Sequence, residues 1–246
     1  TEGSVASVQR VGYPSPNLRI AARFAEQPDA HIDQVLDELA RDLYGPDAAP
    51  HARRAWTAFS RAFTEFPYHG QVVYQGPQQL GPANLLHERP TGYRATMVGF
   101  PYDDLDGWRG PYPADVFAAQ MEKVATGWTE GLELIKRAVE LAPPEKRSAA
   151  ASDFRVAQAA RIHFASVANQ TRFILARTVL AQANVSDSKA QARRQLLQTL
   201  DSETTLRGIP PDLADSIERR ATATGASLNK TVIDLLTARV ASHPEP

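Results

Sequence analysis

Apolar residues recur at intervals of three and four along most of this 246-residue chain, a spacing that predicts amphipathic helices. One predicted helix carries its apolar stripe from Ile32 to Leu43 and ends at Gly45 and Pro46. A second covers roughly residues 48–65, and its aromatic residues are predicted to be buried: Trp56, Phe59 and Phe63. Residues 1–29, by contrast, have the composition of a loop.

Three further helical stretches follow. One begins near Pro113, because proline is favoured in the first turn of a helix, and it ends before Pro143. An alanine-rich helix covers about residues 145–184, and the stretch KAQARRQLLQTLD continues the helical pattern after a break at VSDS. The chain is therefore predicted to be mainly α, with a helical domain over residues 1–201.

Residues 67–113 interrupt this pattern with many glycines, prolines and aromatic residues. A loop of this length within a compact domain is usually functional, or is structured by its own packing. Aromatic faces stack on sugar rings, and acidic residues stand close to aromatic ones here. The candidate carbohydrate contacts are Tyr93, Asp103, Asp104, Asp106 and Trp108. The alternative is a capping loop whose acidic side chains accept hydrogen bonds from backbone amides in turns.

The tail, residues 202–246, shows a different pattern that starts at TTLRGIPPDL. Alternation predicts a short strand with Thr205 and Arg207 on one face. A Pro-initiated helix, a turn at Gly225 and a second helix capped by Ser227 then follow. About forty residues with one strand cannot close a core alone, so the strand is expected to pair with that of a second copy.

The run TLRGIPPDLADSIERRATATGASLNKTVIDLLTARV resembles the ribbon-helix-helix family of Arc/MetJ-like repressors and antitoxins. This resemblance implies a homodimer through the strand at 203–208, which would enter the DNA major groove. The base-reading residues would be Thr205 and Arg207, with Glu203 at the edge. Phosphate would be held at the start of the second helix by Ser227, Leu228, Asn229 and Lys230. The alternative is a dimerisation module without DNA binding.

A second resemblance covers roughly residues 8–201. The stretches GYPSPNLRIAARFAEQPDA and AWTAFSRAFTEFPYH are similar to the helical region downstream of the catalytic barrel in bacterial glycoside hydrolase-like proteins. The stretches QGPQQLGPANLL and PTGYRATMVGFPYDDLDGWRGPYP are similar to the substrate-side segment of the same proteins. Glycoside hydrolysis needs two flanking carboxyl groups, which barrel enzymes place at strand ends. The chain shows no alternating strands and helices and no identifiable acid/base pair, so catalytic residues are not assigned.

Composition restricts the partners further. The 27 basic and 28 acidic side chains give a formal net charge of −1, so binding to nucleic acid must come from a local patch. The absence of cysteine excludes disulfides and thiolate metal sites, and the six histidines lack metal-ligand spacing. We expect no cofactor, no metal, no membrane insertion and a cytoplasmic location.

Two functional hypotheses follow. The first is a dimeric, sequence-specific DNA-binding protein, either a transcriptional regulator or an antitoxin-like protein with a toxin partner, whose N-terminal helical domain has an unknown role. The alternative is a non-catalytic C-terminal fragment of a carbohydrate-active protein with a fused tail.

Overall fold

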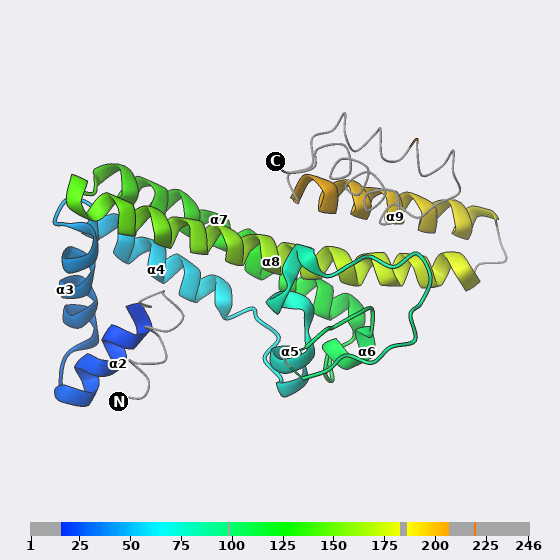
Figure 1. Cartoon of the computed structure of the whole chain (residues 1–246), viewed down its shortest axis with the longest axis horizontal. Helices are drawn as coiled ribbons and strands as arrows, with labels where there is room; N and C mark the ends of the chain where they lie inside the picture. The colour runs from blue at the N-terminus through cyan, green and yellow to red at the C-terminus, as the bar shows by residue number, and fades with distance from the viewer. Residues whose placement is uncertain (1–15, 98, 183–185, 207–218, 220–246) are drawn as a thin grey trace, which may run out of the picture. The chain divides into compact units, whose positions relative to one another are not determined.

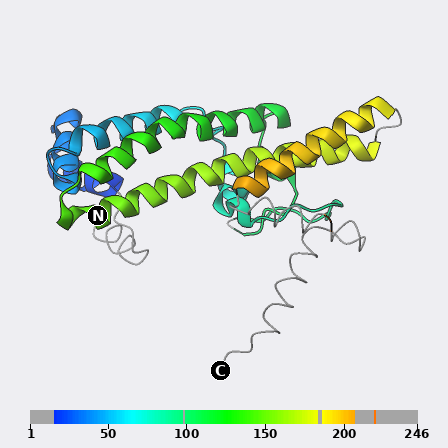
Figure 2. The same ribbon diagram turned by 90° about the horizontal axis from the view of Figure 1, so that it is seen from above.

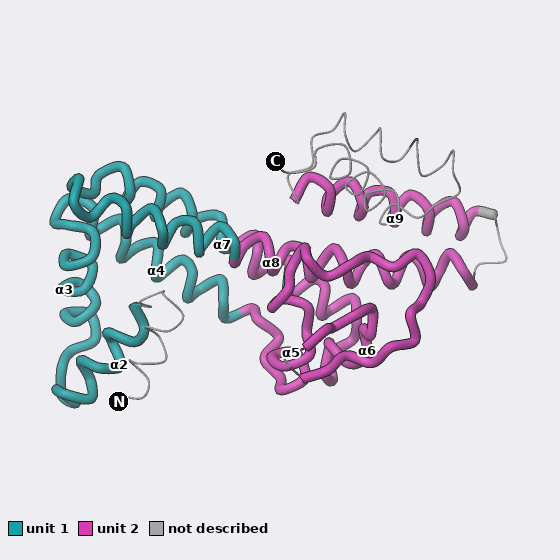
Figure 3. Tube along the Cα trace, viewed as in Figure 1, with its two compact units in different colours: residues 1–64, 127–159 teal, residues 65–126, 160–246 magenta. Residues whose placement is uncertain are grey.

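A computed structural model describes residues 16–97, 99–182, 186–206 and 219 of the chain (Figure 1). Every regular element in these residues is a helix, which confirms the prediction of a mainly α protein. The chain divides into two compact units (Figure 3). Unit 1 comprises Thr1–Thr64 and Gly127–Ala159, and unit 2 comprises Glu65–Thr126 and Ala160–Pro246. The long helices α7 (Ala114–Leu141) and α8 (Pro144–Gln182) contribute residues to both units.

Unit 1 contains α2 (Pro16–Glu26), α3 (Ile32–Tyr44) and α4 (Ala49–Phe63) besides its parts of α7 and α8. The predicted end of the first helix is confirmed, because Gly45 takes a φ of 87° and its N–H donates to Arg41 O at 2.9 Å. Helix α2 was not predicted. It is short and buries no residue, so its apolar pattern gave little signal.

Helix α4 buries a stripe of alanines rather than its aromatic residues. The buried positions are Ala49, Ala52, Ala55, Ala58 and Ala62. Trp56 and Phe59 pack beside this stripe and are partly buried, whereas Phe63 is exposed, so the prediction that Phe63 is buried was wrong. Small side chains let neighbouring helices approach closely, and the larger rings are then accommodated at the sides of the contact.

Unit 2 contains α5 (Gly70–Gln75), the single 3₁₀ turns η1 (Pro77–Gln79) and η2 (Gly81–Ala83), α6 (Leu105–Trp108) and α9 (Ser186–Leu206). Its apolar core joins the Gly/Pro-rich segment to the long helices. The buried core residues are Val72, Trp108, Phe117, Met121, Val167, Ala168, Phe173 and Ile174. The segment predicted as a loop, residues 67–113, is therefore structured by packing against α7 and α8.

Helix α9 runs alongside the unit 2 part of α8, as Figures 1 and 2 both show. Its inward face repeats at intervals of three and four residues. The buried or partly buried positions are Ala192, Leu196, Thr199, Leu200 and Glu203. This stripe continues the KAQARRQLLQTLD pattern for one more turn, to Leu206. The helix crosses the expected domain boundary at residue 201, and that division remains a prediction.

The predicted strand at 203–208 is wrong where the structure describes it. Residues 203–206 form the last turn of α9, so the ribbon-helix-helix resemblance and a dimer paired through this strand lose their basis. A four-residue alternation is too short to outweigh a helical stripe that runs into it from the preceding fifteen or so residues. Thr205 is exposed on the helix and Glu203 is buried, so neither belongs to a DNA-reading ribbon. The remaining predicted DNA contacts lie outside the described residues: Arg207, Ser227, Leu228, Asn229 and Lys230.

Candidate functional site

Three aromatic side chains gather on the segment that precedes α7 in unit 2. Tyr93 and Phe100 are 64% and 65% exposed, and the partly buried Tyr102 lies between them. Its ring centroid is 5.2 Å from that of Tyr93 and 6.0 Å from that of Phe100. We call Tyr93, Phe100 and Tyr102 the aromatic platform. Contiguous exposed apolar surface of this kind marks binding sites more often than single exposed residues do.

The backbone of Tyr102 is held in an unusual conformation. Its φ is 51°, and it is the only non-glycine residue with positive φ in the described part of the chain. Such a conformation costs about 1–3 kcal/mol and persists only where the surroundings impose it. The carbonyl before Tyr102 accepts a hydrogen bond from Trp108 Nε1 at 2.8 Å, and the carbonyl of Tyr102 accepts one from Asn84 Nδ2 at 2.8 Å. Both flanking peptides are therefore fixed.

Asp103, the next residue, is buried in an ion pair. Its Oδ2 lies 2.8 Å from Arg177 Nη2 of α8, and the two side chains are only 6% and 9% exposed. Asp103 also accepts hydrogen bonds from the hydroxyl and the backbone N–H of Thr91. Arg177 Nη1 donates to His87 O at 2.5 Å. This ion pair thus joins three points of the segment to α8.

Asp104 forms a second set of contacts that hold the segment together. Its Oδ2 accepts the backbone N–H of Ala95 at 2.9 Å, and its Oδ1 pairs with Arg94 Nη1 at 3.0 Å. The Arg94 side chain is otherwise exposed, whereas the Asp104 carboxylate is mostly buried. Together with Asp103, this contact holds the chain around Tyr93 against the chain around Tyr102.

The Asp103 carboxyl has a pKa below its usual value of 3.8. Burial alone would raise this pKa, but hydrogen bonds from Thr91 and Arg177 and the charge of Arg177 outweigh it. Because the folded pKa lies below the unfolded one, ionised Asp103 stabilises unit 2 above about pH 4, and this contribution is lost as the pH falls through the folded pKa.

Replacing Asp103 by asparagine should therefore cost stability at neutral pH and progressively less as the pH falls below about 4. The measurement is the free energy of urea unfolding of the parent and of Asp103→Asn between pH 3 and pH 7. A difference between the two proteins that is the same at every pH would contradict this reading of the ion pair.

The structure separates the predicted carbohydrate contacts. Tyr93 lies in the platform, and Asp106 is exposed and paired with Arg109 at 2.7 Å. Asp103 and Asp104 support the segment from within it. Trp108 is fully buried with its indole N–H bonded to Pro101 O, so the expectation that its face contacts a sugar is corrected: Trp108 supports the platform from below. Phe100 was missed, since a single phenylalanine in a loop gives no signal of its own exposure.

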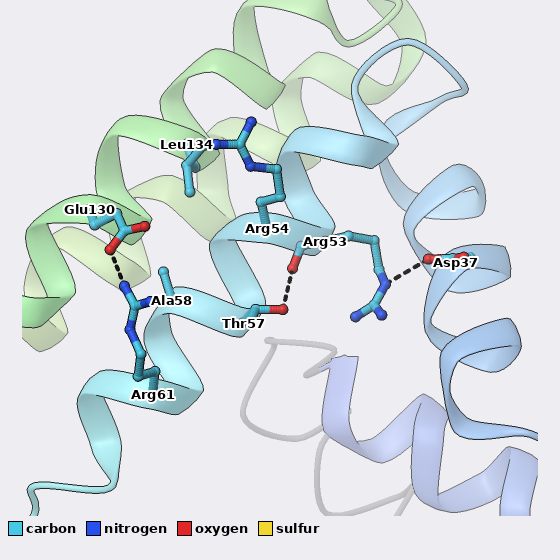
Figure 4. A pocket seen from close by; sticks show the side chains of 8 residues that line it. All are labelled: Asp37, Arg53, Arg54, Thr57, Ala58, Arg61, Glu130 and Leu134. Atoms are coloured by element: carbon cyan, nitrogen blue, oxygen red, sulfur yellow. Dashed lines mark hydrogen bonds and ion pairs between the residues drawn. The ribbon is translucent and has the colours of Figure 1, made fainter.

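Unit 1 contains a second concave feature, an open pocket of about 350 Å³ (Figure 4). It is lined by Asp37, Arg53, Arg54, Thr57, Ala58, Arg61, Glu130 and Leu134. Figure 4 shows that the three guanidinium groups do not converge. Arg53 is directed at Asp37 at 2.7 Å, Arg61 at Glu130, and Arg54 elsewhere. Two of these cations are already neutralised, so the pocket does not form a cradle for an anion.

Other kinds of site find no support within the described residues. No group of three or more acidic, histidine or cysteine side chains there is arranged to hold a metal ion. Likewise, no described helix combines the length and apolar character needed to cross a membrane.

No protein-family model, curated protein or solved structure matches the chain. The resemblance to glycoside hydrolase-like proteins is therefore not supported by any family match. The ribbon-helix-helix resemblance is wrong, because residues 203–206 are helical. The function must be argued from the geometry of this chain alone.

Proposed function

We propose that unit 2 is a non-catalytic carbohydrate-binding module and that the aromatic platform is its binding surface. The observation that carries this proposal is the contiguous set of the exposed Tyr93 and Phe100 rings and the partly buried Tyr102 ring between them, on a backbone fixed from both sides. Aromatic rings present a large apolar face at little cost in conformational entropy, and tyrosine adds a hydroxyl at its edge. A sugar ring offers the complementary combination of apolar C–H faces and polar hydroxyl edges.

The surroundings of the platform favour a sugar over a purely apolar partner. Exposed charged groups, those of Arg94 and Asp106, lie on the same segment and can hydrogen-bond to hydroxyls. The two carboxylates nearest Tyr102 are engaged by Arg177, Thr91, Arg94 and a backbone amide. Asp103 and Asp104 are thus committed to holding the segment, which favours binding rather than hydrolysis.

The relative tilt of the rings narrows the ligand class. Tyr93 and Tyr102 are inclined by 51°, and Phe100 and Tyr102 by 40°, so the platform is twisted rather than flat. The ring separations of 5.2 and 6.0 Å are those of directly packed aromatic pairs. Rings inclined in this way suit a soluble oligosaccharide better than the flat face of a crystalline polysaccharide.

Replacing Tyr93 by alanine is expected to weaken oligosaccharide binding about tenfold or more, equivalent to about 1.4 kcal/mol, because one stacking face is lost. Phe100→Ala should act similarly. The measurement is isothermal titration calorimetry with soluble oligosaccharides selected on a glycan array. Tyr68→Ala is the matched control, since Tyr68 is another exposed tyrosine of unit 2, outside the platform.

Two results would overturn the proposal. One is that the full chain binds no soluble glycan on the array or in solution at millimolar concentration. The other is that a glycan binds but Tyr93→Ala, Phe100→Ala and Tyr68→Ala all leave its affinity unchanged. Capture of a protein partner that Tyr93→Ala abolishes would instead reassign the platform to protein recognition.

A further inference from the structure

Glu203 lies at the inner face of α9 and is only 1% exposed. Its Oε1 accepts a hydrogen bond from Ser166 Oγ at 2.6 Å, and its Oε2 accepts one from Asn169 Nδ2 at 3.0 Å. Both donors belong to α8. A carboxylate buried at a helix contact is costly unless it is hydrogen-bonded, so these contacts fix where the end of α9 docks.

From Ser166 the hydrogen bonds continue into the Gly/Pro-rich segment. Gln170 Nε2 donates to Ser166 Oγ and to Gly81 O, each at 2.9 Å. Gln170 Oε1 in turn accepts from Asn84 Nδ2 at 2.8 Å. Asn84 Nδ2 also donates to Tyr102 O at 2.8 Å. The chain of contacts therefore runs without a gap from α9 to the central residue of the aromatic platform.

The four side chains that link α9 to Tyr102 are all buried, those of Glu203, Ser166, Gln170 and Asn84. Gln170 and Asn84 each use both N–H groups of their amides, and the Gln170 carbonyl receives one of those from Asn84. The Ser166 hydroxyl oxygen accepts a hydrogen bond from Gln170, and the Ser166 hydroxyl proton is donated to Glu203. A buried network of this kind is rigid while complete, and removal of one member leaves its neighbours without partners.

We propose that Glu203, Ser166, Gln170 and Asn84 are positioning residues for the aromatic platform, through which the docking of α9 on α8 holds Tyr102 in its left-handed conformation. Tyrosine disfavours that conformation. When the Asn84 side chain no longer holds the Tyr102 carbonyl in place, the Tyr102 backbone is therefore expected to leave the positive-φ region. The rings of Tyr93 and Phe100 then lose the ring that joins them. The link from α9 to Tyr102 is structural, and its consequence for glycans rests on the proposed function.

The test is Glu203→Ala in the full chain, examined by hydrogen exchange and by glycan titration. We expect amides of residues 99–105 to exchange about tenfold faster and glycan affinity to fall about tenfold. Amides in the first half of α7, which belong to the same core, should stay protected. Asp201→Ala is the control, because Asp201 is an exposed acid in the same turn of α9. Glu203→Gln should show a smaller effect, since one of its two oxygens remains as an acceptor.

The outcomes separate the two proposals. Faster exchange at 99–105 in a protein whose parent binds no glycan would uphold the positioning role and refute carbohydrate binding. Faster exchange in α9 with no change at 99–105 would overturn the positioning role, as would unchanged exchange in both. If Glu203→Ala unfolds unit 2 as a whole, Asn84→Leu and Glu203→Gln decide the question. Either of these must still increase exchange at 99–105 while α7 stays protected.

Discussion

Replacing Arg177 by methionine is expected to lower the free energy of unfolding of unit 2 by about 3–5 kcal/mol. Methionine keeps much of the volume of the side chain but removes the charge. Asp103 then remains buried without its cation, and His87 O loses the guanidinium donor. Breaking one side of a buried ion pair costs far more than the pair itself contributes, because the remaining charge has no hydration.

Urea unfolding followed by circular dichroism measures this loss, and hydrogen exchange assigns it to unit 2. Arg172→Met is the matched control on the same helix, since its pair with Glu122 is solvent-exposed and should contribute only about 0–1 kcal/mol. Adding Asp103→Asn to Arg177→Met should recover part of the loss, because the uncompensated charge is removed. A loss below about 1 kcal/mol for Arg177→Met would show that the pair does not hold the segment.

The sequence could predict the long helices because their signal is repeated over many turns. The apolar stripes of α3 and α7 each extend over several turns, and prolines or glycines mark the ends of these helices and the start of α8. The same apolar spacing continues through α9 to Leu206, but the predicted helical stretch ended at Asp201. The few residues around Thr204 also fit a strand, but the helical stripe that runs into them and the packing of Glu203 against α8 favour the helix.

The sequence could predict which residue types make up the site but not how they are arranged. Sequence position brings Tyr93, Asp103 and Trp108 into one segment, but it does not say which of them faces water. That choice is made by the turn at Tyr102, which depends on Asn84, 18 residues away, and on Trp108. The ion pair between Arg177 and Asp103 is more distant still along the chain. Contacts of this kind have no periodicity, so no local pattern reports them.

Trp108→Ala is expected to destabilise unit 2 by about 3–5 kcal/mol and to disorder the platform at the same time. The indole is fully buried within the unit 2 core, and alanine leaves a cavity in its place. The same change removes the donor to Pro101 O, which holds the peptide before Tyr102. Stability and glycan binding should therefore fall together, and hydrogen exchange at residues 99–105 should rise.

Trp108→Phe separates these two contributions. It fills most of the cavity but cannot donate to Pro101 O, so it should cost about 1–3 kcal/mol and still increase exchange at residues 99–105. Trp128→Phe is the control, since that indole donates to Ala157 O at 3.0 Å in unit 1 and should leave residues 99–105 unchanged. If Trp108→Phe left both exchange at 99–105 and glycan affinity at parental values, the hydrogen bond would have no part in holding Tyr102. The platform would then depend on core packing and on Asn84 alone.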